Sequence, residues 1–325
     1  MRSNITNKPK CLILCAGLGS RLRPLTLHTP KPMATICDVP LFDAALASCL
    51  RAGFRNIAIN THHLSDLMTS HALSCAKEGG LKEIYISKEM PEILGTGGAL
   101  HQLTDWWGED DLLVYNGDIL SEISLEQLWL THQASANLVT LVYRAAPPAD
   151  GGRSLWLDSA QRVVAIAKKE DLPADLPKEG LREAGFACAY VVRPRFREFL
   201  PKQGGFFDLI DGFNRAIAAG ETISGMPFSG YWADIGNPKA LWEANLLVNS
   251  MPAASRHKLL GRSAEGKMSQ ASNFTVDSRS FIASSVTPGP GCVIENSVLL
   301  RGAVVAPGEH LSGVLRGLGL NETFS

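Results

Sequence analysis

Strand-like and helix-like segments alternate along the first half of the chain, and this alternation constrains the fold most strongly. Apolar residues recur at helical spacing over residues 41–50, and short apolar runs flank them at 12–15 and 56–60. Repeated alternation of this kind predicts an α/β fold with a mixed, mainly parallel sheet flanked by helices. The expected strands are 12–15, 56–60, 83–87, 112–115 and 138–143, and the expected helices are 41–50, 65–78, 99–107 and 125–136.

The next hundred residues continue the same domain in a less regular way. A proline- and glycine-rich break at 147–152 precedes a predicted hairpin over 156–166 and a loop over 173–180. A strand over 186–192 and two helices, over 209–219 and 238–249, are expected to follow. Because these strands can extend the first sheet, we interpret residues 1–250 as one domain.

The C-terminal part has a different pattern. Residues 251–270 are polar and rich in small residues, which is typical of a linker. In the tail, residues 271–325, apolar side chains recur every six residues, as expected for a short parallel β-helix of about two coils. The alternative is a few irregular strands packed on the main domain. The two six-residue series are Val293, Leu299, Val305 and Leu311, and Cys292, Val298 and Val304.

Composition excludes some classes of function. Among 325 residues, 31 basic and 32 acidic residues nearly cancel, so a generally basic nucleic-acid-binding surface is not indicated. No apolar run approaches the ~20 residues that span a bilayer, and the polar N-terminus lacks a secretory signal, so we expect no membrane partner. The seven cysteines are scattered without a Cys-x-x-Cys pair. This favours reduced, buried thiols in the cytoplasm over a zinc or redox motif.

A glycine-containing loop, residues 15–26, follows the first apolar strand. Its Gly17 and Gly19 allow backbone N–H groups to approach a phosphate closely. Arg21 and Lys31 add positive charge for a polyphosphate. The loop lacks the third glycine of a dinucleotide fingerprint and the Gly-Lys-Ser/Thr ending of a P-loop. The sequence therefore predicts a phosphate site of another kind.

Further polar residues follow the expected strands, where ligands of open parallel sheets bind. Asp118 ends a buried strand, where a carboxylate can hold Mg²⁺ against phosphates, or can cap a helix. Asp234 offers a second carboxylate with the same alternative. Asn60 is a candidate for the base or ribose, or a turn residue, and Gly95–Gly98 either admit a ligand or form a simple loop. Residues 168–170 meet a sugar phosphate or form a solvated edge.

In these motifs the chain resembles the sugar-1-phosphate nucleotidyltransferase family. The resemblance covers about residues 10–248 and implies a Rossmann-like fold. It also implies that the tail is the left-handed β-helix that several members carry. The matching segments are 17–26 with Pro30-Lys31-Pro32, 94–98, Asn116-Gly117-Asp118 and 232–236.

The resemblance implies a reaction and a role for each residue. A sugar-1-phosphate oxygen would attack the α-phosphorus of a nucleoside triphosphate and release pyrophosphate. Arg21 would hold the leaving pyrophosphate, Lys31 would neutralise charge at the α-phosphate, and Asp118 and Asp234 would ligate Mg²⁺. The nucleotide would be lined by Ala16, Gly17, Gly19, Ser20, Arg21, Asn60, Gly95 and Thr96, and the sugar phosphate by Gly117, Lys169 and Gly185.

The sequence leaves the substrate and some alternatives open. Many members carry Glu-Lys-Pro in the sugar-binding segment, and Lys168-Lys169-Glu170 departs from that pattern. The motifs most resemble bacterial mannose-1-phosphate guanylyltransferases and N-acetylmuramate-1-phosphate uridylyltransferases, and residues 91–98 favour the guanylyl branch. The alternatives are a regulatory subunit without catalysis and a dinucleotide-dependent oxidoreductase, for which Asp38 or Asp43 would be the acidic residue. Assembly into a homo-oligomer is also left open.

Overall fold

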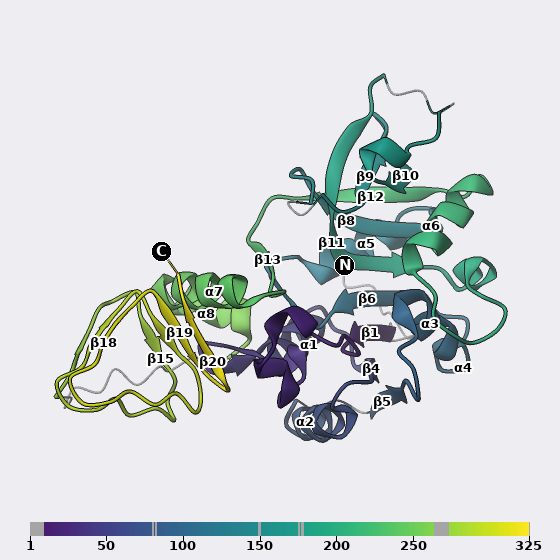
Figure 1. Ribbon diagram of the computed structural model, residues 1–325. Helices are drawn as coiled ribbons and strands as arrows, with labels where there is room; N and C mark the ends of the chain where they lie inside the picture. The colour runs from purple at the N-terminus through teal and green to yellow at the C-terminus, as the bar shows by residue number, and fades with distance from the viewer. Residues whose placement is uncertain are drawn as a thin grey trace.

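A computed structural model of the chain describes residues 10–79, 81, 83–148, 151–174, 176, 179–262 and 273–324 (Figure 1). Its centre is a nine-stranded sheet, in which seven strands follow the order β12–β8–β11–β6–β1–β4–β5 and two more, β9 and β10, extend from β11. Among the seven, β11 alone runs antiparallel to its neighbours. The bounds are β1 Lys10–Leu14, β4 Asn56–Thr61, β5 Glu83–Lys88, β6 Leu112–Asn116, β8 Val139–Arg144, β9 Ser154–Leu157, β10 Val163–Ala167, β11 Arg182–Val192 and β12 Ile223–Phe228.

Helices cover both faces of this sheet, as the alternating pattern predicted (Figure 1). Side chains along β1 alternate between two apolar cores: Leu12 and Leu14 pack with α3, α4 and α6, whereas Cys11 and Ile13 pack with α1, α2 and α5. The predicted mixed, mainly parallel sheet flanked by helices is therefore confirmed. The helices are α1 Leu41–Arg51, α2 Ser65–Glu78, α3 Gly95–Gln102, α4 Thr104–Trp107, α5 Leu125–Gln133, α6 Leu209–Ala218 and α7 Pro238–Ser250.

Several short elements differ from the sequence expectation. The helix expected over 99–107 begins earlier, at Gly95, and is divided into α3 and α4. A two-stranded ladder of β7 (Ile119–Ser121) and β13 (Trp232–Asp234) was not expected, because three-residue strands carry almost no periodic signal. The phosphate-loop region also contains short 3₁₀ helices and a small ladder. These are η1 Ser20–Leu22, η2 Leu25–Leu27, η3 Lys31–Met33, β2 Thr35–Ile36 and β3 Val39–Pro40.

The tail forms stacked parallel strands beside the α/β domain (Figure 1). Two ladders, β14–β16–β18 and β15–β17–β19, repeat with offsets of 17 or 18 residues, which is three six-residue sides per coil. The β-helix-like prediction is therefore confirmed, although Val304 is 79% exposed and breaks the second series. The strands are β14 Thr275–Val276, β15 Phe281–Ile282, β16 Val293–Glu295, β17 Val298–Leu299, β18 His310–Ser312, β19 Val314–Gly317 and the antiparallel β20 Leu320–Thr323.

The tail packs against the α/β domain. One apolar core joins Phe281 and Leu315 of the tail to Leu22 and Leu25 beside the phosphate loop. Trp242 Nε1 of α7 also donates a hydrogen bond to a tail carbonyl. The segment predicted to be a linker contains helix α8, Ala253–Leu260, whose last two leucines are buried, and its residues 263–270 lie outside the described residues. No helix among the described residues is long and apolar enough to cross a bilayer.

Candidate active site

The carboxyl ends of β1, β4, β5 and β6 meet at one edge of the sheet, where four of the predicted segments lie. The glycine loop follows β1, Asn60 is the next-to-last residue of β4, Gly95–Gly98 come after β5, and Gly117 and Asp118 follow β6. Ligands of open parallel sheets bind at this edge because the loops that leave the strands converge there. The fold therefore brings the phosphate loop and the first predicted metal ligand together.

A buried lysine joins the two predicted metal ligands. Lys31 Nζ lies 2.5 Å from Asp118 Oδ2 and 3.2 Å from Asp234 Oδ1. The lysine side chain is 10% exposed, against 41% for Asp234, so the cluster opens to solvent on the Asp234 side. Burial alone lowers the pKa of Lys31, but the two carboxylates outweigh it and raise the pKa above its ordinary value. Lys31 is therefore held as a cation.

The short β7–β13 ladder sets the spacing of the two carboxylates. Ile119 is directly opposite Asp234 in this antiparallel pair, and the Ile235 amide donates a hydrogen bond of 3.3 Å to the Asp118 carbonyl. Residues far apart in the chain are thus held side by side by backbone contacts. The tryptophan-to-glycine motif at 232–236 serves to place Asp234 against Asp118.

Two glycines pack closely against Arg21 and Lys31, the two predicted cationic side chains. Arg21 lies beside Asp234, with 3.9 Å between a guanidinium nitrogen and Oδ2. A Cβ on Gly236 would lie 2.9 Å from that same nitrogen, so this glycine leaves room for Arg21. Gly19 has a φ of +61°, and a Cβ there would lie 3.0 Å from Lys31 Cβ. The glycines of both motifs therefore serve the positions of Arg21 and Lys31.

A cavity of about 160 Å³ lies beside the cluster and gathers most of the predicted nucleotide residues. Asp118 belongs both to the wall of this cavity and to the cluster of Lys31, Asp118 and Asp234. The cavity is bounded by the glycine loop and by the first turn of α3, the two segments in which most of the nucleotide-binding residues were predicted. The predicted residues in its wall are Ala16, Gly17, Asn60, Gly95, Thr96 and Asp118.

Glu89 is a site residue that the sequence analysis missed. It is 1% exposed, lines the same cavity, and accepts hydrogen bonds from Asn60 Nδ2 (2.7 Å) and from the Leu94 amide (2.8 Å). Asn60 in turn accepts a hydrogen bond of 2.7 Å from the Cys15 amide. Glu89 thus connects the ends of three strands. Its position directly after β5, at the ligand edge, was the available signal.

Other predicted residues are placed less directly. Ser20 is exposed in η1, and Lys169 is exposed in η4, Lys169–Asp171, after the edge strand β10. A Cβ on Gly117 would lie 2.9 Å from Cys15 Sγ, and one on Gly185 would meet the Ala146 carbonyl at 2.5 Å. Packing therefore already requires both glycines, and the contacts of Gly117, Lys169 and Gly185 with a sugar phosphate stay predictions.

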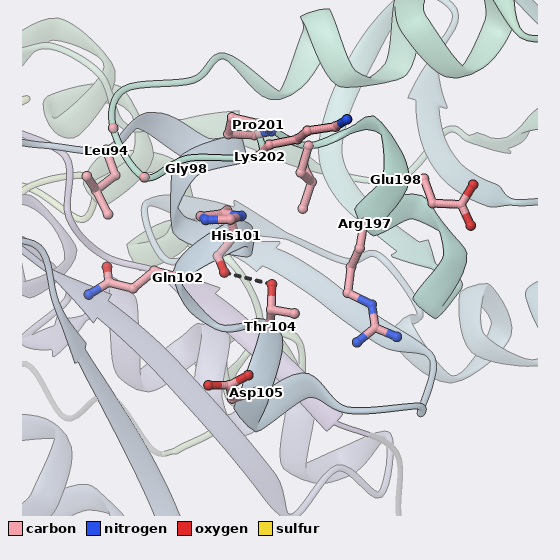
Figure 2. A pocket seen from close by; sticks show the side chains of 13 residues that line it. Leu94, Gly98, His101, Gln102, Thr104, Asp105, Arg197, Glu198, Pro201 and Lys202 are labelled. Carbon is pink, nitrogen blue, oxygen red and sulfur yellow. Dashed lines mark hydrogen bonds between the residues drawn. The ribbon is translucent and has the colours of Figure 1, made fainter.

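A larger cavity of about 790 Å³ lies on the other side of the Gly95–Gly98 turn. Figure 2 shows His101 and Thr104 on one wall, and Arg197 and Lys202 on the facing segment. Only Gly98 of the predicted turn reaches this cavity. The predicted catalytic and metal-binding side chains line the smaller cavity or lie beside it, so we place the chemistry there.

Comparison with known proteins gives consistent results. A family model described as "Nucleotidyl transferase" matches residues 10–250. The chain is 28% identical over 315 residues to mannose-1-phosphate guanylyltransferase of Mycobacterium tuberculosis, covering 95% of this chain and 80% of the relative. It is 27% identical over 246 residues to N-acetylmuramate alpha-1-phosphate uridylyltransferase of Caulobacter vibrioides, covering 73% and 96% respectively.

The fold is similar to a solved structure as well. A Bacillus anthracis protein described as a glucose-1-phosphate thymidylyltransferase, solved in complex with sucrose, aligns with a TM-score of 0.62 at 20% identity. The alignment covers 75% of this chain and 96% of the other. At this identity the likeness concerns the fold, and it confirms the architecture predicted from the alternating pattern.

Proposed function

Because the chain belongs to the sugar-1-phosphate nucleotidyltransferase family, we propose that it joins GTP and mannose-1-phosphate, or a closely related sugar-1-phosphate. The family match confirms the resemblance drawn from the four motifs. It also confirms the reaction class, in which a nucleoside triphosphate and a sugar-1-phosphate give a nucleotide-sugar and pyrophosphate. The proposal adds the base, the sugar and the role of each side chain.

The convergence of Lys31, Asp118 and Asp234 carries the proposal. The carboxylates of Asp118 and Asp234 both contact the Lys31 ammonium at the ligand edge of the sheet, and their oxygens are hard donors. Such donors suit a divalent cation of the kind that members of this family generally use, and we propose Mg²⁺. When bound, the cation supplies positive charge between the triphosphate and the sugar phosphate, and Asp118 and Asp234 would hold it.

The reaction needs positioning and charge more than proton transfer. An oxygen of the sugar phosphate forms a bond to the α-phosphorus, while the bond from that phosphorus to the bridging oxygen breaks. The electron pair leaves with pyrophosphate. Lys31 offsets the negative charge that builds at the α-phosphate, and Arg21 holds the leaving group. The nucleophile is already an anion, so no general base is required.

Glu89 supports guanine as the base. Each of its carboxylate oxygens accepts one protein hydrogen bond, and an ionised carboxylate offers about four acceptor positions. About two acceptor positions therefore remain on a carboxylate that lines the cavity, and we propose that they face the base. The Watson–Crick edge of guanine presents two neighbouring N–H donors, whereas that of uracil presents one. A paired acceptor therefore favours guanine.

A matrix of triphosphates against sugar-1-phosphates, read by pyrophosphate release, tests this proposal. GTP with mannose-1-phosphate is expected to give the highest kcat/KM. A preference for UTP with N-acetylmuramate-1-phosphate would overturn the base and the sugar. Tight triphosphate binding with no turnover for any pair would overturn the proposed catalysis and support a regulatory subunit. We further propose that the protein acts in the cytoplasm, which its free cysteines support.

The Glu89→Gln substitution tests how the base is read. It replaces one acceptor oxygen with a donor, so the preference for GTP over UTP is expected to fall by about tenfold, the loss of one good hydrogen bond. The measurement is the ratio of kcat/KM values for the two triphosphates. Glu92→Gln, at an exposed neighbour, is the matched control. An unchanged ratio in Glu89→Gln would remove this carboxylate from base recognition.

A further inference from the structure

Helices α1 and α2 bring together three side chains of different chemistry, away from the sheet edge. Asp43 is in the first turn of α1, and His71 and Cys75 are four residues apart on α2. One potential ligand atom from each residue lies within 4.8 Å of the others. In the part of the chain that the structure describes, this is the one such group of His, Cys, Asp or Glu.

The contacts converge on a common point. His71 Nε2 lies 2.5 Å from Asp43 Oδ1, Cys75 Sγ lies 3.5 Å from the same ring nitrogen, and Sγ lies 3.6 Å from Oδ1. A proton relay would need the two partners on opposite nitrogens of the imidazole ring. Here both partners meet at Nε2, so the three atoms form a triangle and not a chain.

The triangle has nearly the dimensions of a metal coordination face. Tetrahedral Zn²⁺, with bonds of about 2.0 Å to nitrogen or oxygen and 2.3 Å to sulfur, separates its ligand atoms by about 3.3–3.6 Å. The two distances to sulfur already have that length. Only the contact between His71 and Asp43 is shorter, and it has to open by less than about 1 Å.

The surroundings hold the side chains in this arrangement. Arg262 lies 3.3 Å from Asp43 Oδ2, which leaves Oδ1 to face the histidine and the cysteine. The ring of Phe42 packs edge-on against His71, with 6.0 Å between centroids. The Asp43 and His71 side chains are 12% and 23% exposed, so the group is shielded but within reach of water. A carboxylate held through its far oxygen is typical of a metal ligand.

We propose that Asp43, His71 and Cys75 bind Zn²⁺, or a divalent cation of similar softness, with water as the fourth ligand. A mixed set of oxygen, nitrogen and sulfur donors suits zinc and excludes Mg²⁺ as a good occupant. The three donor atoms lie within 4.8 Å of one another, so we infer that side-chain adjustments bring all three to one ion. The site is separate from the proposed magnesium site and independent of the proposed reaction.

Binding would strengthen the link between two helices that already touch through apolar packing and through the Asp43–His71 hydrogen bond. Burial and the neighbouring Asp43 raise the pKa of Cys75 to about 12, so the thiol releases its proton to solvent as the ion binds. The ion then joins α1 to α2, and the ion pair of Asp43 extends the link to Arg262 after α8. We expect the bound ion to stabilise the fold, because the unfolded chain lacks the assembled site.

Cobalt and zinc titrations of the metal-free full chain test the proposal, with Mg²⁺ in excess to occupy the carboxylate site. We expect one Co²⁺ per chain, a thiolate-to-cobalt charge-transfer band in the near ultraviolet, and displacement by Zn²⁺ with a rise in Tm. Cys75→Ser should abolish the band, and both Cys75→Ser and His71→Gln should weaken zinc binding at least tenfold. Cys292→Ser, in the tail, and His257→Gln, on the exposed side of α8, are the matched controls.

Three results would overturn the site. The first is zinc binding without a cobalt–thiolate band in the wild-type chain. The second is equal zinc affinity in the wild type and in His71→Gln, which keeps the thiol. The third is a loss of the band in Cys292→Ser but not in Cys75→Ser, which would place the thiolate ligand elsewhere. Circular dichroism of each variant establishes that the loss of binding occurs in a folded chain.

Discussion

Two clusters of polar side chains in this molecule differ in the partners that they give to aspartate carboxylates. At the sheet edge, Asp118 and Asp234 share the ammonium of Lys31, so the chain supplies its own cation. Between α1 and α2, Asp43 directs one oxygen to a nitrogen and a sulfur donor and the other to Arg262. The first arrangement presents only hard oxygen donors to a metal, and the second presents a mixed set. Donor chemistry therefore separates the proposed magnesium site from the proposed zinc site.

The clusters also differ in how the fold assembles them. Lys31 and Asp234 are 203 positions apart, and their meeting depends on the central sheet and on the β7–β13 ladder. His71 and Cys75 are one helical turn apart, and only Asp43 comes from another element. A substitution at the sheet edge should therefore affect catalysis, whereas one between the helices should affect metal content and local stability.

Asp118→Asn is expected to have the largest effect. It keeps the shape of the side chain but removes the charge that faces Lys31 and the proposed cation, so kcat should fall by about 10³-fold. Pyrophosphate release measures the loss, and circular dichroism checks that the fold is retained. Asp66→Asn, at an exposed ion pair with Lys88, is the matched control. Near-normal turnover in Asp118→Asn would remove this residue from the reaction.

Lys31→Met should lower kcat by about 10²-fold and also lower stability near neutral pH, because two carboxylates lose their shared cation. The pKa of Lys31 is raised in the folded chain, so its contribution is fully present below the unfolded value of about 10.4 and is lost as the pH rises through the folded value. Urea unfolding of both proteins at pH 8 and at about pH 11 measures this. A stability difference that does not shrink at the higher pH would contradict the assigned ion pairs.

Local sequence patterns predicted the regular elements and the residues next to them. Asp118 follows a continuous apolar strand, so its place at the ligand edge was readable from its neighbours. Asp234 stood out as an acid in a short apolar segment before a glycine, but its place beside Asp118 depends on the pairing of β13 with β7, which local spacing does not reveal. Glu89 was missed because it is a single polar residue after a strand, and its role depends on contacts with Asn60 and Leu94.

The tail and the helix pair show the same limit. Six-residue spacing predicted the β-helix coils, but most of the coils repeat after 17 residues, so a strict six-residue count slips by one position, and Val304 is exposed. The scattered cysteines argued against a zinc motif. Spacing within one segment cannot reveal that α1 places Asp43 against His71 and Cys75, since that pairing is a property of tertiary packing.

Gly236→Ala should have an intermediate effect at the sheet edge. A Cβ there would lie 2.9 Å from an Arg21 guanidinium nitrogen and 3.3 Å from Asp234 Oδ2, and the flexible arginine has to move away. We expect kcat/KM for the triphosphate to fall by about tenfold, the loss of one charged contact, with little change in Tm. Steady-state kinetics with varied triphosphate measures this. Unchanged kinetics would show that Arg21 acts from another position.

Arg262→Gln should have the smallest effect and should act only on the helix pair. The guanidinium is 53% exposed in its ion pair with Asp43, so we expect zinc affinity to fall by about two- to fivefold, as for the loss of a surface ion pair. Turnover with Mg²⁺ should stay at the wild-type level, because Arg262 contacts no residue of the sheet-edge cluster among its described partners. A zinc titration and a pyrophosphate assay on the same preparation measure both. If turnover falls with zinc affinity, the two clusters are coupled, and the separation between a catalytic edge and a metal-binding helix pair no longer holds.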